Sequence, residues 1–186
     1  FDNTAAAGMR LFISGSAPLL AETFRQFETR TGQRILERYG MSETVMLTSN
    51  PYEGHRAAGT VGLPLPDVSV RVVDDAGKPC ACDEVGGVEV RGPNVFGGYW
   101  RMPEKTREEF TADGWFKTGD VGRFDAQGYL TIVGRSKDLI ISGGYNVYPK
   151  EVESYLDDMP GVAESAVIGV PDRDFGEAVT AVVVPQ

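Results

Sequence analysis

The sequence has few of the residues that bind transition metals or form disulfide frameworks. It contains one histidine, His55, and two cysteines, Cys80 and Cys82, which one residue separates in a polar turn. These side chains are too few for a structural zinc site, which takes a tetrahedral set of ligands. Such sparse thiols favour reduced cysteines in a cytosolic or mitochondrial-matrix compartment. His55 lies in a loop between glycine and arginine, where we expect a structural or solvated role rather than a catalytic one.

Long apolar runs and basic clusters are also missing. No run approaches the roughly 20 apolar residues that span a bilayer, and the first residues, FDNTAAAGMR, lack the basic-then-apolar pattern of a signal peptide. The net charge is −9, without a basic stripe, so we expect no nucleic-acid partner. Hydrophobic residues at 41% and charged residues at 24% are typical of a soluble globular protein. We therefore expect a cytoplasmic protein, with the mitochondrial matrix as the other possible compartment.

Residues 1–58 have the pattern of an α/β fold. Arg10–Ser14 is a short apolar strand, and Leu20, Phe24 and Phe27 then recur at helical spacing. After Gly32, which ends the helix, Gln33–Arg38 is a second strand. A strand, a crossover helix and a strand of this length predict parallel pairing. In such sheets ligands bind at the carboxyl ends of strands, where the segments SGSAP and YGMSET lie.

Residues 59–134 have a different texture, rich in glycine, proline and short strands. We expect strands at Val68–Val73, Gly87–Arg91 and Tyr129–Val133, and either a strand or a turn at Phe96–Trp100. Pro103–Phe110 is expected to form a short helix. Recurrent short strands between turns predict a small antiparallel barrel or sandwich.

Residues 135–186 are expected to start a small α+β domain. Gly134–Asp138 has the composition of a domain junction, a helix begins at Pro149, and strands follow at Val162–Val170 and Ala178–Val184. The fold class is therefore α/β plus a β-barrel-like subdomain, followed by the beginning of a second domain.

The stretch Thr118–Glu153 is the densest in turn residues and charges. Asp120 is predicted to end a polar loop, and the apolar run Leu139–Ile141 opens onto Ser142-Gly143-Gly144. Glycine-rich turns let backbone amides approach a ligand closely, and Asp and Arg suit sugar hydroxyls and anionic oxygens. From spacing alone, a surface hairpin followed by a charged turn explains the pattern equally well.

Three blocks resemble the signature of the adenylate-forming enzymes, the superfamily of acyl-CoA synthetases, luciferases and peptide-synthetase adenylation domains. They are SGSAP, YGMSET, and TGD followed by GRSKDLIISGG and YPKEVE. The resemblance covers essentially the whole chain. Within the superfamily, GSAPLL, ERYGMSET, GPNVFGGYWRMPEKT and ISGGYNVYPKEVES are most similar to malonyl-CoA synthetases.

The resemblance implies a reaction with ATP, Mg²⁺, a carboxylic acid and coenzyme A. An acyl-adenylate and pyrophosphate form first, and coenzyme A then displaces AMP. The resemblance assigns the nucleotide contacts to Ser16, Ala17, Pro18, Tyr39, Gly40, Ser42, Asp120 and Arg135. It implies that Tyr39 stacks on adenine, Ser42 reaches the α-phosphate, Asp120 accepts from the ribose hydroxyls, and Glu43 binds Mg²⁺.

The remaining roles concern the acid, coenzyme A and domain motion. Arg38, whose forked donors suit a carboxylate, and the adaptable Met41 are candidates for an acyl pocket that takes malonate. An alternative is that Arg38 pairs with Glu37 or Glu43. By resemblance, Lys137 is the hinge of a rotating C-terminal domain, and Ser142, Gly143 and Gly144 approach the pantetheine arm.

Two parts of the family pattern do not occur in these 186 residues. There is no Ser/Thr/Gly-rich phosphate loop ending in Pro-Lys-Gly, and no C-terminal Pro-x-x-x-x-Gly-Lys segment. We therefore expect a segment of a longer ligase, inactive alone, in which 1–134 ends the AMP-binding domain and 135–186 begins the mobile C-terminal domain.

Two alternatives stay open. One is a synthetase or amino-acid adenylation domain for another acid, although no acidic residue suited to an amino group is evident in the three blocks. The other is a non-catalytic nucleotide-binding segment, which the two missing motifs favour.

Overall fold

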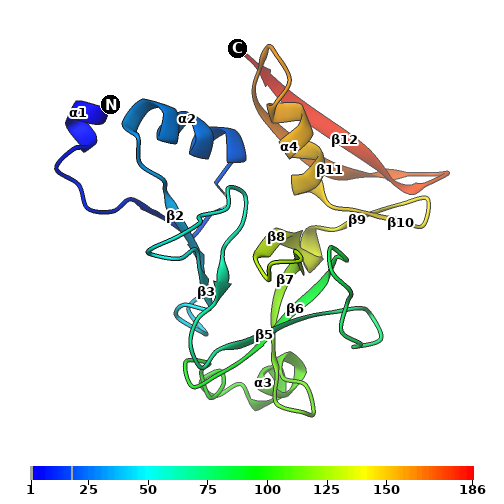
Figure 1. Cartoon of the computed structure of the whole chain (residues 1–186). Helices are drawn as coiled ribbons and strands as arrows, with labels where there is room; N and C mark the ends of the chain where they lie inside the picture. The colour runs from blue at the N-terminus through cyan, green and yellow to red at the C-terminus, as the bar shows by residue number, and fades with distance from the viewer. Residues whose placement is uncertain (1, 18) are drawn as a thin grey trace. The chain divides into compact units, whose positions relative to one another are not determined.

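The computed structural model describes residues 2–17 and 19–186 (Figure 1). The chain divides into two compact units. The first unit is Phe1–Thr118 with Gly122–Ile132, and the second is Gly119–Val121 with Val133–Gln186. Across the described residues, no helix combines the length and the apolar character needed to cross a membrane.

The first unit begins with the predicted parallel βαβ arrangement. Strand β1 (Ile13–Ser14) pairs in parallel with β2 (Leu36–Tyr39), and helix α2 (Ala21–Thr31) connects them (Figure 1). A short helix, α1 (Asn3–Ala6), precedes β1. The sequence pattern did not predict α1, which is a single turn capped by the Asp2 side chain.

Helix α2 owes its position to aromatic packing and its end to a glycine. Phe24 is buried, and the Phe27 ring lies edge-on to Phe12, with centroids 4.9 Å apart. Gly32 adopts a left-handed conformation (φ 68°) and its N–H donates to the Glu28 carbonyl at 2.8 Å, a common way to end a helix.

Two strands of two residues each extend this sheet. β3 (Thr48–Ser49) pairs antiparallel with β2, and β4 (Leu63–Pro64) pairs antiparallel with β3, in the order β1-β2-β3-β4. The buried Asn50 side chain stabilises this edge, because its Nδ2 donates to the Thr60 carbonyl (2.8 Å) and its Oδ1 accepts from the Ala57 N–H (2.9 Å).

A second sheet has the order β5-β6-β7-β8. Its strands are β5 (Ser69–Val73), β6 (Gly86–Arg91), β7 (Phe116–Phe124) and β8 (Leu130–Arg135). The buried core of the first unit comprises Leu47, Val72, Val88, Val90, Phe116 and Leu130. Among the described residues no strand pair closes β8 onto β5, so the barrel-like closure stays a prediction.

Phe96–Trp100, before helix α3 (Pro103–Glu109), is an irregular segment with a bend at Gly97 and a turn beginning at Trp100, so the strand alternative is wrong. Phe96 packs edge-on against Phe116, with ring centroids 5.2 Å apart. Pro103 occupies the first turn of α3, where a missing N–H costs nothing.

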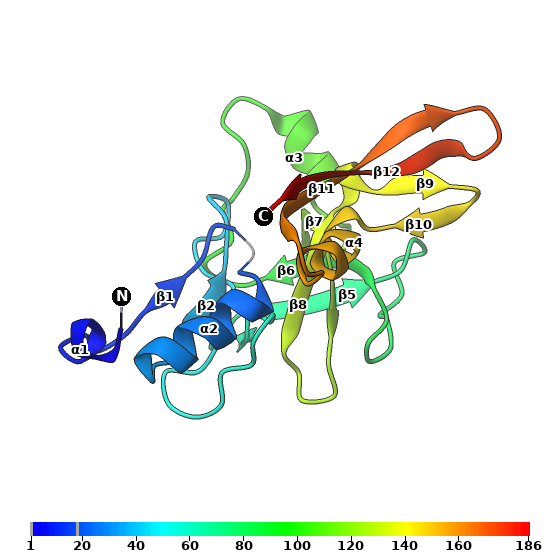
Figure 2. The same ribbon diagram turned by 90° about the horizontal axis from the view of Figure 1, so that it is seen from above.

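The second unit is α+β, as predicted. It contains the 3₁₀ turn η1 (Ser136–Asp138), β9 (Ile140–Ser142), β10 (Tyr145–Val147), α4 (Pro149–Asp157), β11 (Val162–Asp172) and β12 (Gly176–Pro185). The sheet order is β10-β9-β12-β11, and α4 lies beside β11 (Figure 2).

Carboxylates of α4 fix β11 in place. Glu153 Oε1 accepts from the Val167 N–H at 2.9 Å, and the Ser165 hydroxyl donates to Asp157 at 2.6 Å. Val167 is also buried, so burial of an apolar side chain and a charge-assisted hydrogen bond occur at the same residue of β11.

Candidate functional site

The turn that follows β1 lies beside the end of β2. A Cβ atom added to Gly15 would lie 3.3 Å from the Arg38 carbonyl oxygen and 3.6 Å from Arg38 Cγ. Ser16 adopts a left-handed conformation (φ 69°), and Ser16 and Ala17 are exposed. Pro18 lies outside the described residues. The first two sequence blocks therefore meet at the carboxyl ends of two parallel strands, as the sheet rule predicts.

The YGMSET block is a tight reversal that depends on Gly40. An added Cβ at Gly40 would collide with the Val45 carbonyl oxygen. The chain then returns to β2, because the Leu47 N–H donates to the Tyr39 carbonyl at 2.9 Å. Only glycine permits this close approach of two backbone segments.

The side chains of this block divide between the core and the surface. Tyr39 and Met41 are half-buried and pack against the hydrophobic core. Ser42 is exposed. A hydroxyl and part of an aromatic ring are thus accessible at the strand end, whereas Met41 is partly used in packing.

The Glu43 carboxylate is positioned by a residue that sequence reasoning did not single out. The Tyr99 hydroxyl donates to Glu43 Oε1 at 3.1 Å, and the Phe96 N–H donates to the Glu43 carbonyl at 2.8 Å. Asn94 Nδ2 adds hydrogen bonds to the carbonyls of Thr44 (2.7 Å) and Met46 (2.9 Å). Asn94, Phe96 and Tyr99 belong to the block GPNVFGGYW. The sequence analysis used this block only as a resemblance to the family and assigned no role to its residues.

The Tyr99 hydroxyl is a hydrogen-bond donor that keeps its proton. Burial raises the pKa of Tyr99, and the neighbouring Glu43 carboxylate raises it further. The proton therefore stays on Tyr99 at neutral pH, and the hydroxyl donates to Glu43. A carboxylate held in this way suits a hard cation such as Mg²⁺.

Glu43 is the carboxylate that could take part in binding a metal ion together with nucleotide oxygens. Among residues 2–17 and 19–186 no group of three or more His, Cys, Asp or Glu side chains is arranged to hold a metal ion. Mg²⁺ is commonly bound by one or two carboxylates together with substrate phosphates. Glu43 can therefore supply one ligand, with phosphate oxygens as others.

Arg38 is exposed at the end of β2. In the part of the chain that the structure describes, no ion pair joins Arg38 to Glu37 or Glu43, so the alternative of a local ion pair finds no support. The backbone carbonyl and the Cγ atom of Arg38 border the Gly15 turn, and a guanidinium is suited to binding an anion.

Glu37 is a buried acid that the sequence pattern did not reveal. It is 5% exposed, and its Oε1 has no hydrogen-bond partner. Burial raises the pKa of Glu37 from 4.5 to about 7, while a hydrogen bond from the Gly59 backbone opposes this change. The charge state of this side chain next to Arg38 therefore changes near neutral pH.

In the second unit, Asp120 and Arg135 lie together. Arg135 Nε is 3.4 Å from Asp120 Oδ1, and Asp120 is 7% exposed. The predicted polar loop at Asp120 is wrong, because Asp120 lies within β7. Thr118 and Asp120 are polar but occupy buried positions of β7. The alternation of apolar and polar residues therefore did not predict this strand.

The rest of the third block forms a linker and a hairpin. Lys137 is exposed in η1. Ser142 ends β9, and Gly143 (φ 58°) and Gly144 (φ 83°) form the turn to β10. Of the apolar run before it, Ile140 is buried but Ile141 is 54% exposed.

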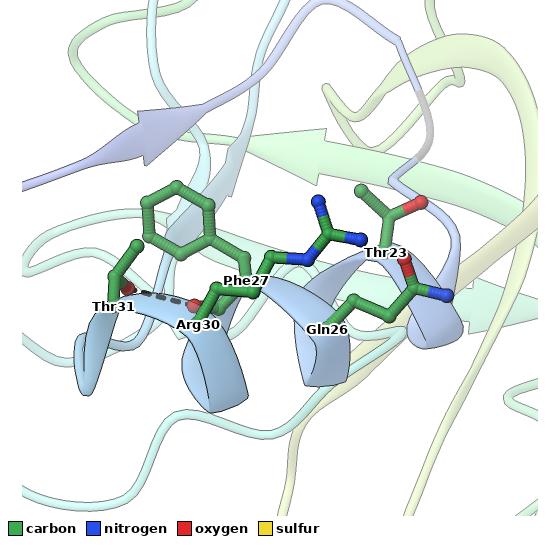
Figure 3. Close-up of a pocket in the computed structure, with 5 residues that line it drawn as sticks. All are labelled: Thr23, Gln26, Phe27, Arg30 and Thr31. Atoms are coloured by element: carbon green, nitrogen blue, oxygen red, sulfur yellow. Dashed lines mark hydrogen bonds between the residues drawn. The ribbon is translucent and has the colours of Figure 1, made fainter. Parts of the chain in front are cut away.

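A shallow hollow on α2 is separate from these residues. Figure 3 shows its lining residues, Thr23, Gln26, Phe27, Arg30 and Thr31, all from one helix. The Thr31 hydroxyl donates to the Phe27 carbonyl at 2.7 Å. No residue predicted to bind nucleotide, acid or coenzyme A lines this hollow.

Comparison with known families identifies two parts of the chain. The model of the AMP-binding enzyme family matches residues 2–100, and the model of the AMP-binding enzyme C-terminal domain matches residues 151–186.

Curated relatives match almost the whole chain. A malonate–CoA ligase of Arabidopsis thaliana is 48% identical over 183 residues, which cover 98% of this chain and 30% of the relative. A sulfoacetate–CoA ligase of Cupriavidus necator is 44% identical over 182 residues, which cover 97% of this chain and 36% of the relative. The chain thus spans about a third of the length of these relatives.

The fold agrees with a solved structure of the same kind. ATP-bound MatB from Rhodopseudomonas palustris superposes with a TM-score of 0.97 at 61% identity, over 100% of this chain and 37% of that chain. The resemblance drawn from the three sequence blocks is confirmed, and the chain belongs to the AMP-binding enzymes.

Proposed function

We propose that the full-length protein containing this chain is an AMP-forming acid–CoA ligase that uses malonate. A carboxylate oxygen of the acid attacks the α-phosphorus of ATP, and the bond to the bridging oxygen breaks to release pyrophosphate. The thiolate of coenzyme A then attacks the acyl carbon, and AMP leaves. The observation that carries the proposal is the exposed Arg38 beside the Gly15 turn, at the strand end that carries YGMSET.

Candidate nucleotide contacts occur in each unit. In the first, the turn Ser16-Ala17-Pro18 and the residues Tyr39 and Gly40 would border adenine, since a glycine-lined strand end and an aromatic ring suit a flat base. The Ser42 hydroxyl is exposed and would donate to the α-phosphate.

The ribose contacts belong to the second unit. Asp120 would accept hydrogen bonds from both ribose hydroxyls, and Arg135, 3.4 Å from it, would reach the same sugar or the phosphate.

Mg²⁺ would be held by Glu43 together with phosphate oxygens. When bound, the ion neutralises negative charge on the phosphates. The contribution of this chain is to orient the Glu43 carboxylate through Tyr99, so that a ligand is fixed before the nucleotide arrives.

The domain boundary proposed for the ligase lies close to the division between the two units at Val133, except that Gly119–Val121 go with the large domain. We assign 1–134 to the end of the large AMP-binding domain and 135–186 to the beginning of a mobile C-terminal domain, with Lys137 as the hinge. The exposed 3₁₀ turn at Lys137 is short enough for a few dihedrals to absorb a rotation. Ser142, Gly143 and Gly144 would then lie along the pantetheine arm of coenzyme A.

Malonate is proposed because it carries a second carboxylate. A buried charge needs a paired cation, and Arg38 presents forked donors without an ion-pair partner among the described residues. Met41 would border the methylene side. The names of the relatives, which specify malonate and sulfoacetate, agree with an acid that has a second anionic group.

The test is Arg38→Ala in the full-length protein, with pyrophosphate release measured on malonate and on propionate. We expect activity on malonate to fall about 10²-fold or more, because a buried charge pair worth roughly 3 kcal/mol is lost. Activity on propionate should fall far less or rise.

Arg25→Ala is the matched control, since Arg25 is exposed on α2 and pairs only with Glu22 at 3.6 Å among the ion pairs of the described residues. An equal loss on both acids in Arg38→Ala would assign Arg38 to the nucleotide or the fold and would remove the support for malonate.

A further inference from the structure

The glycine turn after β9 is held by the tip of the β11–β12 hairpin. Ser142 pairs with Gly176 across the two strands. The Gly143 N–H donates to the Phe175 carbonyl at 2.9 Å. The position of the turn therefore depends on how β12 contacts β9, and the ladder between these strands consists of the single pair Ser142–Gly176.

Next to the last backbone pair, a side-chain hydrogen bond joins β12 to β9. The Ile141 N–H donates to Glu177 Oε2 at 2.8 Å. Glu177 follows Gly176 directly on β12, so its carboxylate accepts from the residue adjacent to the last backbone pair. A carboxylate is a stronger acceptor than a neutral carbonyl, and the second contact fixes the register of β9.

Gly169 on β11 leaves room for this carboxylate. A Cβ atom at Gly169 would lie 2.5 Å from Glu177 Oε1 and 3.0 Å from Glu177 Cδ. The same Cβ would lie 3.2 Å from Ile140 Cγ2. The Glu177 carboxylate is thus confined between Gly169 and β9, and a larger residue at 169 would displace it.

The hairpin tip is itself closed by an acid. Asp172 Oδ1 accepts from the backbone N–H groups of Asp174 and Phe175, both at 2.9 Å, and these bonds lower the pKa of Asp172. Gly176 takes the left-handed conformation (φ 78°) that returns the chain into β12. The tip presents the Phe175 carbonyl and the Glu177 carboxylate to β9 as one unit.

We infer that Glu177 is a positioning residue for the thioester-forming half of the reaction. It fixes Ile141, and through it the place of Ser142-Gly143-Gly144. The inference rests on the proposed function, in which this turn lies along the pantetheine arm. Because that turn has no assigned part in adenylate formation, loss of Glu177 slows the second half-reaction and leaves the first unchanged.

The test is Glu177→Ala in the full-length protein, with the half-reactions measured separately. Malonate-dependent pyrophosphate release without coenzyme A reports the first, and single-turnover conversion of preformed malonyl-adenylate by coenzyme A reports the second. We expect the second to slow about tenfold with a higher KM for coenzyme A, since small misplacements of positioning groups cost one to two orders of magnitude. The first should stay within about twofold.

Two further variants separate positioning from packing. Glu177→Gln keeps an acceptor oxygen and should restore most of the second half-reaction. Glu164→Ala removes an exposed carboxylate from the same hairpin and should behave as wild type. Hydrogen exchange at the Ile141 amide should be faster in Glu177→Ala and close to wild type in Glu177→Gln.

Equal slowing of both half-reactions, no slowing of the second, or failure of Glu177→Ala to fold would each overturn the inference, the last because Glu177 would then serve stability. A wild-type protein that forms no malonyl-adenylate would instead overturn the proposed function.

Discussion

Asp120 is a carboxylate at a buried strand position, and its surroundings define what it can bind. It is 7% exposed and lies 3.4 Å from the Arg135 guanidinium, which is itself 58% exposed. A carboxylate has two oxygens that can each accept hydrogen bonds from more than one donor. Two ribose hydroxyls are donors of the right kind.

Asp120→Ala in the full-length protein should weaken ATP use about tenfold or more and leave the fold intact. Charge-assisted hydrogen bonds of this type are worth roughly 1.5–3 kcal/mol each. The KM for ATP and the rate of pyrophosphate release measure the effect. Asp138→Ala, which removes an exposed carboxylate from η1, is the control. If Asp120→Ala kept the wild-type KM for ATP and rate of pyrophosphate release, Asp120 would not bind the ribose hydroxyls.

Glu37 makes stability depend on pH. Burial raises its pKa from 4.5 to about 7 in the folded chain, so the folded state binds the proton more tightly than the unfolded state. Its contribution is fully present below about pH 4.5 and is lost as pH rises through about 7. The shift corresponds to roughly 3 kcal/mol.

Glu37→Gln should therefore flatten the pH dependence and raise the free energy of unfolding above pH 7 by up to about 3 kcal/mol. The amide oxygen of Gln can still accept from the Gly59 backbone. Urea unfolding at pH 5 and pH 8 measures the difference, with the exposed Glu53→Gln as control. Parallel pH profiles for Glu37→Gln and wild type would contradict the role given to burial.

At this scale the sequence predicts residue types better than it predicts their surroundings. Asp120 and Arg135 were both expected to contact the nucleotide, Asp120 at the ribose and Arg135 at the ribose or the phosphate, and they do lie together. The burial of Glu37 was not expected, because a Glu beside Arg38 suggests a surface ion pair. The contact of Tyr99 with Glu43 was not predicted, because this hydrogen bond joins residues 56 positions apart in the sequence. No local sequence pattern encodes such a contact.

At the scale of elements, local signals account for most of what was predicted correctly. Pro103 and Pro149 mark the first turns of α3 and α4, and Gly32 ends α2. The two-residue strands β3 and β4 carry no periodic pattern, and the Asn50 side chain that stabilises this edge bonds to residues of a later loop. Tertiary contacts, not local propensity, create these elements.

The reversal after β2 depends on Gly40, so Gly40→Ala should disturb the whole YGMSET loop. A Cβ there meets the Val45 carbonyl, which is backbone and cannot rotate away. We expect a loss of more than about 2 kcal/mol in the free energy of unfolding, together with at least about tenfold weaker ATP use because Ser42 and Glu43 shift.

Gly97→Ala is the matched control, since nothing lies within 4 Å of a Cβ at that position. Unfolding midpoints and pyrophosphate release in the full-length protein measure both effects. If Gly40→Ala matched Gly97→Ala in stability and activity, the close approach would have no consequence for the site.

At the scale of the whole molecule, the order of the motifs proved more informative than composition. Composition led only to expectations about classes of partner, whereas three blocks in sequence identified the family that the comparisons confirm. The barrel-like closure could not be established in the same way, since pairing between β8 and β5 depends on long-range contacts and the described strands form the open order β5-β6-β7-β8.

The residues at the proposed site complete only part of a ligase. Glu43 is proposed as one metal ligand, and no group of three or more His, Cys, Asp or Glu side chains that could hold a metal ion occurs in the described residues. The 186 residues also contain neither a glycine-rich loop ending in Pro-Lys-Gly nor the Gly-Lys segment whose lysine, by family resemblance, promotes adenylation. The β- and γ-phosphates and the attacking carboxylate would therefore lack their preorganised cations.

Residues 1–186 alone should accordingly form no detectable adenylate. Each missing element of preorganised charge costs several kcal/mol at the transition state, and the two losses fall on opposite sides of the same reacting phosphorus. The purified segment is incubated with ATP, Mg²⁺ and malonate, and pyrophosphate release is followed, with the full-length protein as positive control and circular dichroism as the check that the segment is folded. Acid-dependent pyrophosphate release from the segment would show that Arg38, Ser42, Glu43, Asp120 and Arg135 suffice for adenylation, and the phosphate loop and the lysine would then be dispensable.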